Sequence, residues 1–429
     1  MEVRDASPGY APQVEMPVVP ESYKQTEVGV IPEEWEVRTL GEVSTFLDGQ
    51  RRPVKASDRA KMSGTIPYYG ASGVVDYIND YLFDEELILL GEDGENILSR
   101  NLRLAFRISG KSWVNNHAHV IRPNSDISIG FLTEYLESLD YSGLNSGTAQ
   151  PKLNKQKCLA IHVAVPPIVE QRAIATALSD VDALLEALDR LIAKKRDIKQ
   201  ATMQQLLTGQ TRLPGFEGEW ALFNMAKNST LKARIGWQGL TTAEYLKLGD
   251  YGLVTGTDFN DGKVVWEGCY FVEKNRYEQD KNIQLKPNDV LVTKDGTIGK
   301  AAYIDELPFP ATLNSGVFVI RPSNDSYHPK YFYYVLMSQV FTDFLNKLAA
   351  GSTISHLYQK DFVNFEFPAP TSKEEQIAIA TILSDIDTEL EALHQRRTKT
   401  AALKQAMMQE LLTGRTRLVG LQVGAEAGE

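Results

Sequence analysis

The chain has 429 residues, of which 43% are hydrophobic and 24% charged, and its formal net charge is −11. This length and composition indicate an ordinary soluble globular protein of two or three domains. The two cysteines, Cys158 and Cys269, lie far apart in the sequence. A disulfide framework and a cysteine-based zinc site are therefore excluded, and we expect a reducing, cytoplasmic setting. No apolar run is long enough to span a membrane, and the N-terminal residues lack the pattern of a secretion signal.

The chain opens with residues 1–22, which are rich in acidic residues, prolines and glycines and which we expect to form a disordered leader. The next stretch, VGVIPEEWEVRTLGEV at residues 28–43, combines a proline turn, a tryptophan and a short apolar alternation. It predicts an opening loop and a first strand. A similar piece, LPGFEGEWALFNMA, occurs at residues 213–226. Each half of the chain therefore begins with a tryptophan-bearing segment.

The regions that follow contain short β-rich runs separated by Gly, Asn and Asp turns. The landmarks that both regions share are Asp-Gly at 93–94 and 295–296, Val-Ile-Arg-Pro at 120–123 and 319–322, an aromatic helix at 131–139 and 330–341, and a small-residue loop at 146–156 and 350–362. These landmarks recur in the same order but with drifting offsets. We therefore expect one fold used twice, with insertions and deletions, in domains at 23–168 and 213–371.

A long helix is predicted after each β-rich domain, at 169–212 and 372–416, and a flexible tail at 417–429. The helical segments repeat without a gap, because EQRAIATALSDVD begins at Glu170 and EQIAIATILSDID begins 205 residues later, and both copies end in LLTG and TRL. Gly209 and Gly414 stand where left-handed C-caps are expected. Each helix would then have about 36 residues and a length of roughly 54 Å. Two unrelated core helices would leave this repeat unexplained.

Apolar side chains in these helices alternate in steps of four and three, which is typical of a coiled-coil seam. The predicted seam and partner-docking residues are Ile174, Leu178, Val181, Leu185, Leu188 and Ile192 in the first helix and Ile379, Leu383, Ile386, Leu390 and Leu393 in the second. The stripe changes phase at Ile198 and Leu403, which follow Ile192 and Arg397 by six residues instead of seven. This shift resembles the local overwinding of a stammer.

Motifs for catalysis are almost absent. GTIGK at residues 296–300 is too short for a phosphate-binding loop and predicts a turn between strands. His117 and His119 lack a third metal ligand nearby in sequence, so surface or core roles are favoured. The Glu92-Asp93 pair lacks the lysine of a nuclease site, and neither a dinucleotide-binding glycine loop nor an Asn-Pro-Pro-aromatic segment for base methylation occurs. We interpret the chain as non-catalytic, with no catalytic residue and no metal site.

The loops carry side chains suited to contacts with a polar polymer such as DNA. Asn and Gln can pair bidentately with adenine, and Lys or Arg with guanine, in the major groove. In the first domain the candidate DNA contacts are Arg51, Arg52, Tyr69, Ser72, Trp113, Asn115, Asn116, His117, Gln150, Lys152 and Asn154. In the second domain they are Lys294, Thr297, Lys300, Asn314, Ser315, Ser352, Thr353, Ser355, His356, Tyr358 and Lys360.

The net negative charge argues against DNA binding by this chain alone. Basic residues nevertheless gather locally, at 51–55, 100–107 and 152–157, while acidic residues concentrate on the helices and the leader. A single cluster of this kind is more often a solvated surface than a binding site. The charge pattern therefore favours DNA binding with help from partners.

Together these segments resemble the specificity subunits of type I restriction-modification systems. The resemblance covers nearly the whole chain after the leader. It rests on IPEEWEVRTLGEV, on both Glu-Gln helix starts, on both LLTG-x-TRL endings, and on YYGASGVVDYINDYLFD, LVTKDGTIGKAA and SGTAQPKLNK. The second half departs from the family pattern where FPAPT replaces the Pro-Pro that precedes the first Glu-Gln pair.

The resemblance implies an α+β fold with two β-rich target recognition domains separated by two long antiparallel coiled-coil helices, in a pseudo-twofold internal repeat. Each domain would read one half of an asymmetric, bipartite DNA sequence. The helices would set the spacer and dock two methyltransferase subunits, and translocase-endonuclease subunits would join that assembly. The chain itself would bind no cofactor, because S-adenosylmethionine, Mg and ATP would belong to the partners, which would also contact phosphates.

On this interpretation we expect the helices to hold the domains about one turn of DNA apart, roughly 34 Å. An alternative from another class is a non-enzymatic coiled-coil adaptor whose two β-rich domains bind proteins or glycans. An autonomous nuclease or methylase is a further alternative, which the missing motifs disfavour.

Overall fold

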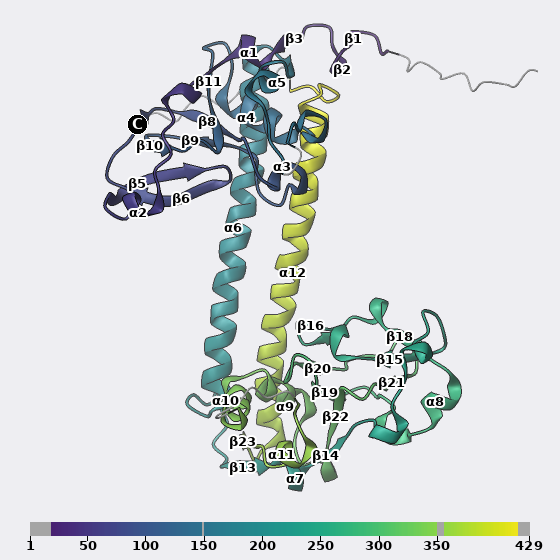
Figure 1. Ribbon diagram of the computed structural model, residues 1–429. Coiled ribbons are helices and arrows are strands. Elements are labelled where there is room, and N and C mark those ends of the chain that lie inside the picture. Colours follow the sequence, from purple (N-terminus) through teal and green to yellow (C-terminus); the bar gives the residue numbers. More distant parts are fainter. Residues whose placement is uncertain (1–18, 148–149, 350–355, 419–429) are drawn as a thin grey trace, which may run out of the picture. The chain divides into compact units, whose positions relative to one another are not determined.

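The computed structural model describes residues 19–147, 150–349 and 356–418 (Figure 1). The chain divides into two compact units, Met1–Leu188 with Arg396–Glu429 and Asp189–Gln395. We call them the first and the second unit. Each unit combines one globular region with parts of both long helices, α6 (Ile168–Leu207) and α12 (Lys373–Leu411).

The first unit begins with the tryptophan-bearing segment predicted from the sequence. Two antiparallel strand pairs form around this segment. They are β1 (Tyr23–Thr26) with β2 (Gly29–Pro32), and β3 (Glu36–Thr39) with the distant strand β12 (His162–Val165). Trp35 lies between β2 and β3 and is fully buried. The short helices of this unit are α1 (Leu40–Val43), α2 (Ala56–Arg59), α3 (Asn96–Ser99) and α5 (Lys155–Leu159).

The other described strands of the first unit form two four-stranded sheets. One has the order β4 (Ser44–Phe46), β11 (Ala118–Pro123), β8 (Leu87–Gly91), β9 (Ala105–Ile108). The other has the order β6 (Gly73–Ile78), β5 (Ser63–Gly70), β10 (Lys111–Val114), β7 (Phe83–Asp84). The aromatic helix α4 (Ile129–Ser138) follows β11, as predicted, and buries Phe131 and Leu132 in the core.

The second unit repeats this plan. Its opening strand β13 (Trp220–Asn224) pairs with β23 (Glu366–Pro370). Its main sheet has the order β14 (Ser229–Lys232), β22 (Val317–Pro322), β19 (Val290–Thr293), β20 (Ala301–Tyr303). A three-stranded sheet has the order β18 (Tyr270–Val272), β15 (Tyr251–Val254), β21 (Ala311–Leu313), and β16 (Phe259–Asn260) pairs with β17 (Lys263–Val264).

The main sheets of the two units match strand for strand, which confirms the prediction of one fold used twice. The turn from Gly296 to Lys300 joins β19 to β20, as predicted, and Gly296 and Gly299 have positive φ angles. One predicted element is wrong, because residues 330–341 do not form a single helix. The chain breaks between α9 (Pro329–Leu336) and α10 (Gln339–Leu348), where the Ser338 hydroxyl accepts a hydrogen bond from the amide of Val340 and caps α10. The other short helices here are α7 (Met225–Asn228), α8 (Lys274–Glu278) and α11 (Gln359–Phe362).

The long helices α6 and α12 have 40 and 39 residues, a few more than predicted. Gly209 and Gly414 both have φ of +72°, which confirms the two left-handed C-caps. Within each unit the helices are antiparallel. In the first unit Asp182 pairs with Lys404 and Glu170 pairs with Arg417, so the residue numbers rise along one helix as they fall along the other.

The predicted seam is buried only in part by contact between the helices. Ile174 and Leu178 lie in a core that also contains Met408 from α12 and residues of the first globular region. Ile379 and Leu383 lie in the corresponding core of the second unit. The other predicted seam residues are buried (Leu188, Ile192, Leu390) or half-buried (Val181, Leu185, Ile386, Leu393).

The continuation of the apolar stripe at Ile198 and Leu403 is wrong, because these side chains are 41% and 55% exposed. The lysine that follows each of them turns inward instead. Lys404 is 8% exposed, and the side chain of Lys199 is 20% exposed. A lysine can occupy such a position because its aliphatic stem packs against apolar neighbours while its ammonium meets a carboxylate. Among the described residues, no helix is long and apolar enough to cross a membrane.

Candidate nucleic-acid interface

Backbone hydrogen bonds bring three loops of the first unit together. The amide of Glu92, just after β8, donates to the carbonyl of His117 at 2.8 Å, and the amide of Leu153 donates to the carbonyl of Glu92 at 2.7 Å. The amide of Asn115 donates to the carbonyl of Tyr69 at 3.1 Å, which ties this turn to β5. We call residues 92–94, 115–117 and 150–154 the recognition loops of the first unit.

The second unit contains the same three bonds. The amide of Lys294, just after β19, donates to the carbonyl of Gly316 at 2.9 Å, and the amide of Leu357 donates to the carbonyl of Lys294 at 2.8 Å. The amide of Asn314 donates to the carbonyl of Val254 at 3.0 Å. Its recognition loops are therefore residues 294–296, 314–316 and 356–358. The structure thus brings together loops that contain half of the sequence-predicted contacts.

The asparagines of the two turns have a structural role. The Asn115 side-chain oxygen accepts from the amide of His117, and that of Asn314 accepts from the amide of Gly316. Asn115 is 7% exposed. Bonds of this kind let an asparagine stabilise a turn through its own backbone. The neighbours Asn116 and Ser315 are exposed and are the side chains that these turns present to solvent.

In the first unit the recognition loops carry paired charges. Arg51 donates to a Glu92 carboxylate oxygen at 2.6 Å and to the carbonyl of Ala118 at 2.6 Å. The ammonium of Lys152 lies 3.3 Å from the other Glu92 oxygen. Burial disfavours the charged form of Glu92, but the hydrogen bond from Arg51 and the neighbouring positive charges outweigh this effect and lower its pKa. Arg51 is therefore engaged inside the unit, while the Lys152 side chain is 53% exposed.

The two predicted histidines have different environments. His117 is exposed, and its Nδ1 lies 2.9 Å from both oxygens of Asp93. His119 is 1% exposed, and its ring nitrogens contact Asp48 at 2.8 Å and the carbonyl of Leu153 at 3.1 Å. This division agrees with the predicted surface and core roles. In the part of the chain that the structure describes, no group of three or more His, Cys, Asp or Glu side chains is placed to hold a metal ion.

The remaining candidates of the first unit fall into two groups. Trp113 is 6% exposed and donates its indole hydrogen to the carbonyl of Arg52, so it belongs to the core and not to the surface. Tyr69 is half-buried beside Phe106, with ring centroids 6.2 Å apart, and the Asn154 side chain caps α5. The exposed candidates are Arg52, Ser72, Asn116, His117, Gln150, Lys152 and Asn154.

The second unit presents more positive charge in the same loops. Lys294 stands where the first unit has Glu92, and its ammonium lies 5.3 Å from the centre of the Phe318 ring. His356 pairs with Asp295 and lies against Tyr358, with ring centroids 4.5 Å apart. The exposed candidates here are Thr297, Lys300, Ser315, Tyr358 and Lys360. Ser352, Thr353 and Ser355 lie outside the described residues.

The repeated helix ends form one ion pair in each unit, which was not predicted from the sequence. In the first unit Arg417 donates to both oxygens of Glu170, at 2.7 and 2.8 Å, and the indole of Trp35 donates to the same carboxylate at 3.0 Å. Arg417 is therefore held in place, so the prediction of a flexible tail at 417–429 is wrong at its first residue. In the second unit Arg212 donates to both oxygens of Glu375, at 2.6 and 2.7 Å. The gapless repeat of Glu-Gln and Thr-Arg-Leu was the sequence signal for this pair.

The glutamine of each Glu-Gln start links a long helix to its globular region. The Gln171 side-chain oxygen accepts from the amide of Ser128, which precedes α4, and its amide group donates to the carbonyl of Pro166. The Gln376 side chain makes the corresponding bonds in the second unit, where it accepts from the amide of His328 before α9. Both glutamines are almost fully buried.

A cluster of charged and polar side chains lies farther along each helix pair, and its lysine is buried in the first unit and half-buried in the second. In the first unit the ammonium of Lys404 lies 2.7 Å from Asp182 and 3.0 Å from Glu134 of α4, and Arg103 pairs with both acids. In the second unit Lys199 lies 2.5 Å from Asp387, which also accepts from the Tyr334 hydroxyl of α9 at 2.9 Å. Lys404 and Lys199 are 205 residues apart, as are Asp387 and Asp182. The internal repeat therefore extends to these contacts.

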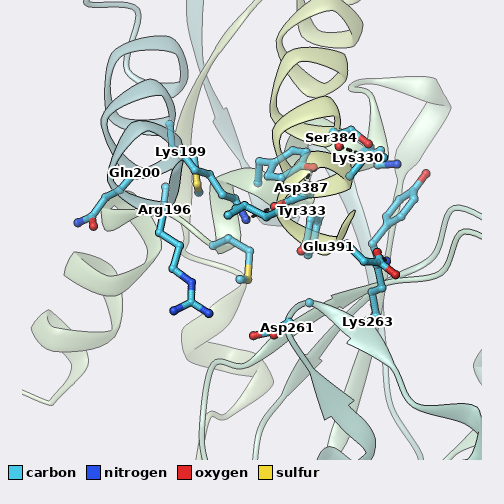
Figure 2. Close-up of a pocket in the computed structure, with 18 of the residues that line it drawn as sticks. Arg196, Lys199, Gln200, Asp261, Lys263, Lys330, Tyr333, Ser384, Asp387 and Glu391 are labelled. Atoms are coloured by element: carbon cyan, nitrogen blue, oxygen red, sulfur yellow. Dashed lines mark hydrogen bonds and ion pairs between the residues drawn. The ribbon is translucent and has the colours of Figure 1, made fainter. Parts of the chain in front are cut away.

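The second unit also contains a groove of about 1270 Å³ beside Lys199 and Asp387 (Figure 2). Its walls come from α6, α9, α12 and the β16–β17 hairpin. Lys263 of the hairpin pairs with Glu391 of α12 at 2.5 Å. Because charges in the lining pair with each other, the groove does not concentrate charge of one sign.

Comparison with known proteins identifies the family. The sequence model described as "Type I restriction modification DNA specificity domain" matches residues 32–194 and again residues 239–403. The chain belongs to this family. The two matches follow the internal repeat, so each match covers most of one target recognition domain and much of the long helix that follows it.

Specificity subunits from other organisms resemble the chain over most of its length. One from Haemophilus influenzae is 26% identical over 365 residues, which cover 83% of this chain and 88% of the relative. One from Methanocaldococcus jannaschii, the MjaVIII specificity subunit, is 25% identical and covers 94% of this chain and 97% of the relative. These relatives are named as specificity subunits, in agreement with the DNA specificity family to which this chain belongs.

Solved structures of the family share the fold. The S subunit of a type I restriction-modification system from M. genitalium superposes with a TM-score of 0.60 at 14% identity, and covers 88% of this chain and 96% of that one. A chain from a study of type I complex assembly and conformational transition superposes with a TM-score of 0.52 at 17% identity, and covers 90% and 99%. The predicted α+β fold with an internal repeat is therefore confirmed.

Proposed function

We propose that the two target recognition domains of this specificity subunit each read one half of an asymmetric, bipartite DNA sequence. One observation carries the proposal. In both units the same three backbone hydrogen bonds hold the recognition loops in the same arrangement, whereas the side chains on those loops differ. A constant frame with different side chains is what two readers of different sequences require.

The side chains predict different chemistry for the two half-sequences. The first unit offers Lys152, Asn116 and His117 beside the acids Glu92 and Asp93. The second unit offers Lys294 at the position of Glu92, and Lys300 and Lys360 are exposed a few residues after its loops 294–296 and 356–358. Lysine favours guanine N7 and O6 or phosphate, whereas amides favour adenine. We therefore expect the second unit to contribute more of the chain's own attraction to DNA.

The partners we propose are two methyltransferase subunits that dock on the long helices and translocase-endonuclease subunits that join them. Exposed apolar side chains support docking, because α6 exposes Leu184 in the first unit and Leu191 and Ile198 in the second. S-adenosylmethionine, Mg and ATP would be bound by those partners. The partners would also neutralise phosphates, which a chain of net charge −11 contacts poorly by itself.

Retention of duplex DNA by the chain with its methyltransferase tests this function against the adaptor alternative. A duplex that carries the target should be retained at moderate salt, and changes in either half-sequence should each weaken retention by about 1–3 kcal/mol per base pair. A scrambled duplex of equal length is the control. Equal retention of target and scrambled duplexes, or none of either, would instead favour an adaptor that binds proteins or glycans.

A further inference from the structure

In the first unit a carboxylate orients an exposed imidazole on the recognition loops. Nδ1 of His117 lies 2.9 Å from both oxygens of Asp93. Because an ionised carboxylate only accepts hydrogen bonds, Nδ1 carries the hydrogen and Nε2 remains for another partner. The His117 side chain is 51% exposed and that of Asp93 20%. Among the described residues, no hydrogen-bond partner occupies Nε2.

The second unit contains a pair of the same composition. Nδ1 of His356 bonds Asp295, and the ring lies against Tyr358. The His356 side chain is 27% exposed and that of Asp295 45%. Here too, within the described residues, Nε2 has no hydrogen-bond partner.

The two aspartates are equivalent, but the two histidines are not. Asp93 and Asp295 each follow the residue that makes two of the three shared backbone bonds, Glu92 or Lys294. His117 comes from the asparagine turn, whereas His356 comes from the loop that contains Lys152 in the first unit. The same carboxylate position therefore receives an imidazole from a different loop in each unit.

The two histidine–aspartate pairs are not needed to hold the recognition loops together. In both units the backbone hydrogen bonds already join the three loops, and they need no imidazole. An additional side-chain pair on an exposed surface contributes little stability, typically below about 1 kcal/mol. What the pair does fix is the direction of the ring, and with it the position of Nε2.

We propose that His117 and His356 each read one base of the corresponding half-sequence through Nε2, and that Asp93 and Asp295 are positioning residues for these rings. The inference rests on the proposed function and deepens it by naming one reader in each domain. With its hydrogen on Nδ1, a neutral imidazole can accept a hydrogen bond at Nε2 from a base amino group in the major groove. Lys152 in the first unit and Lys360 in the second are the nearby cations for the adjoining phosphates or bases.

Mapping of methylated sites in cells that express the chain with its methyltransferase tests the inference. With His117→Ala we expect discrimination at one base pair of the first half-sequence to fall about tenfold, the scale of a single base contact. The second half-sequence should stay unchanged, which also shows that the variant folds and assembles. His356→Ala should have the reverse effect.

The aspartate variants test whether each carboxylate acts through its histidine. Asp93→Ala should relax the same base pair as His117→Ala, and the double variant should be no more relaxed than His117→Ala alone. Glu85→Ala is the matched control, because Glu85 pairs with Arg122 just before β8 whereas Asp93 follows the other end of that strand. This control should keep the wild-type target.

Two results would overturn the inference while leaving the proposed function intact. One is a bipartite wild-type target that both histidine variants still read in full. The other is a uniform loss of methylation at all sequences, which would make the histidines contacts to phosphate. A wild-type target that is not bipartite would instead refute the proposed function itself.

Discussion

Glu170 and Glu375 each link the start of one long helix to the segment that follows the other. Each carboxylate is almost fully buried at the start of a long helix and accepts two hydrogen bonds from an arginine that follows the end of the other helix. A buried charge of this kind costs free energy unless it is paired. The pair therefore explains why both the Glu-Gln starts and the Thr-Arg-Leu endings repeat in the sequence.

Arg417→Ala should lower the free energy of unfolding by about 3 kcal/mol, because it leaves the Glu170 carboxylate buried with only the Trp35 indole as a side-chain donor. The midpoint of urea unfolding of the full chain measures this effect. Lys195→Ala is the control, since Lys195 forms a more exposed pair with Glu389 and should change stability by at most about 1 kcal/mol. If the two substitutions lowered the free energy of unfolding equally, the buried pair of Glu170 and Arg417 would stabilise the chain no more than an exposed pair does.

Individual contacts could be predicted from the sequence only in part. The Gly209 and Gly414 caps followed from local rules, since a left-handed residue at a helix end favours glycine. Trp113 looked like an exposed aromatic beside two amides but lies in the core. Its burial depends on β5 and β10, which pair side by side although their residues are distant in sequence, and local patterns do not encode that pairing.

The long helices were the most predictable elements, because their apolar spacing and gapless repeat are both local signals. The side chain that faces inward after the phase change was not predictable in this way. The stripe pointed to Leu403, whereas Lys404 is buried because Asp182 and Glu134 supply carboxylates from α6 and α4. The break between α9 and α10 at Ser338 likewise interrupts a run of continuous aromatic and apolar residues.

Substitutions at Leu403 and Lys404 test which of these two side chains faces the interior of the first unit. Lys404→Met should lower the free energy of unfolding by about 2 kcal/mol, since Asp182 and Glu134 lose their shared lysine. Leu403→Ala should change it by less than about 0.5 kcal/mol, because Leu403 is 55% exposed. Thermal or urea unfolding of the two variants provides the comparison. If Leu403→Ala lowered the free energy of unfolding more than Lys404→Met, Leu403 and not Lys404 would be the side chain that faces the interior.

At the scale of the whole molecule, the sequence specifies a repeated scaffold with two different sets of loops. The strand order of the main sheet and the contacts at both helix ends are the same in the two units, whereas Glu92 is replaced by Lys294 and the Asp-oriented histidine comes from different loops. A chain of net charge −11 with such loops fits a specificity subunit that works on DNA beside partner subunits.

The most direct test of this account is the map of modified adenines in a genome that expresses the chain with its methyltransferase. We predict one motif that consists of two short, different sequences separated by an unread spacer of fixed length. A continuous motif, or a palindromic one, would contradict the reading of two half-sequences by two different target recognition domains.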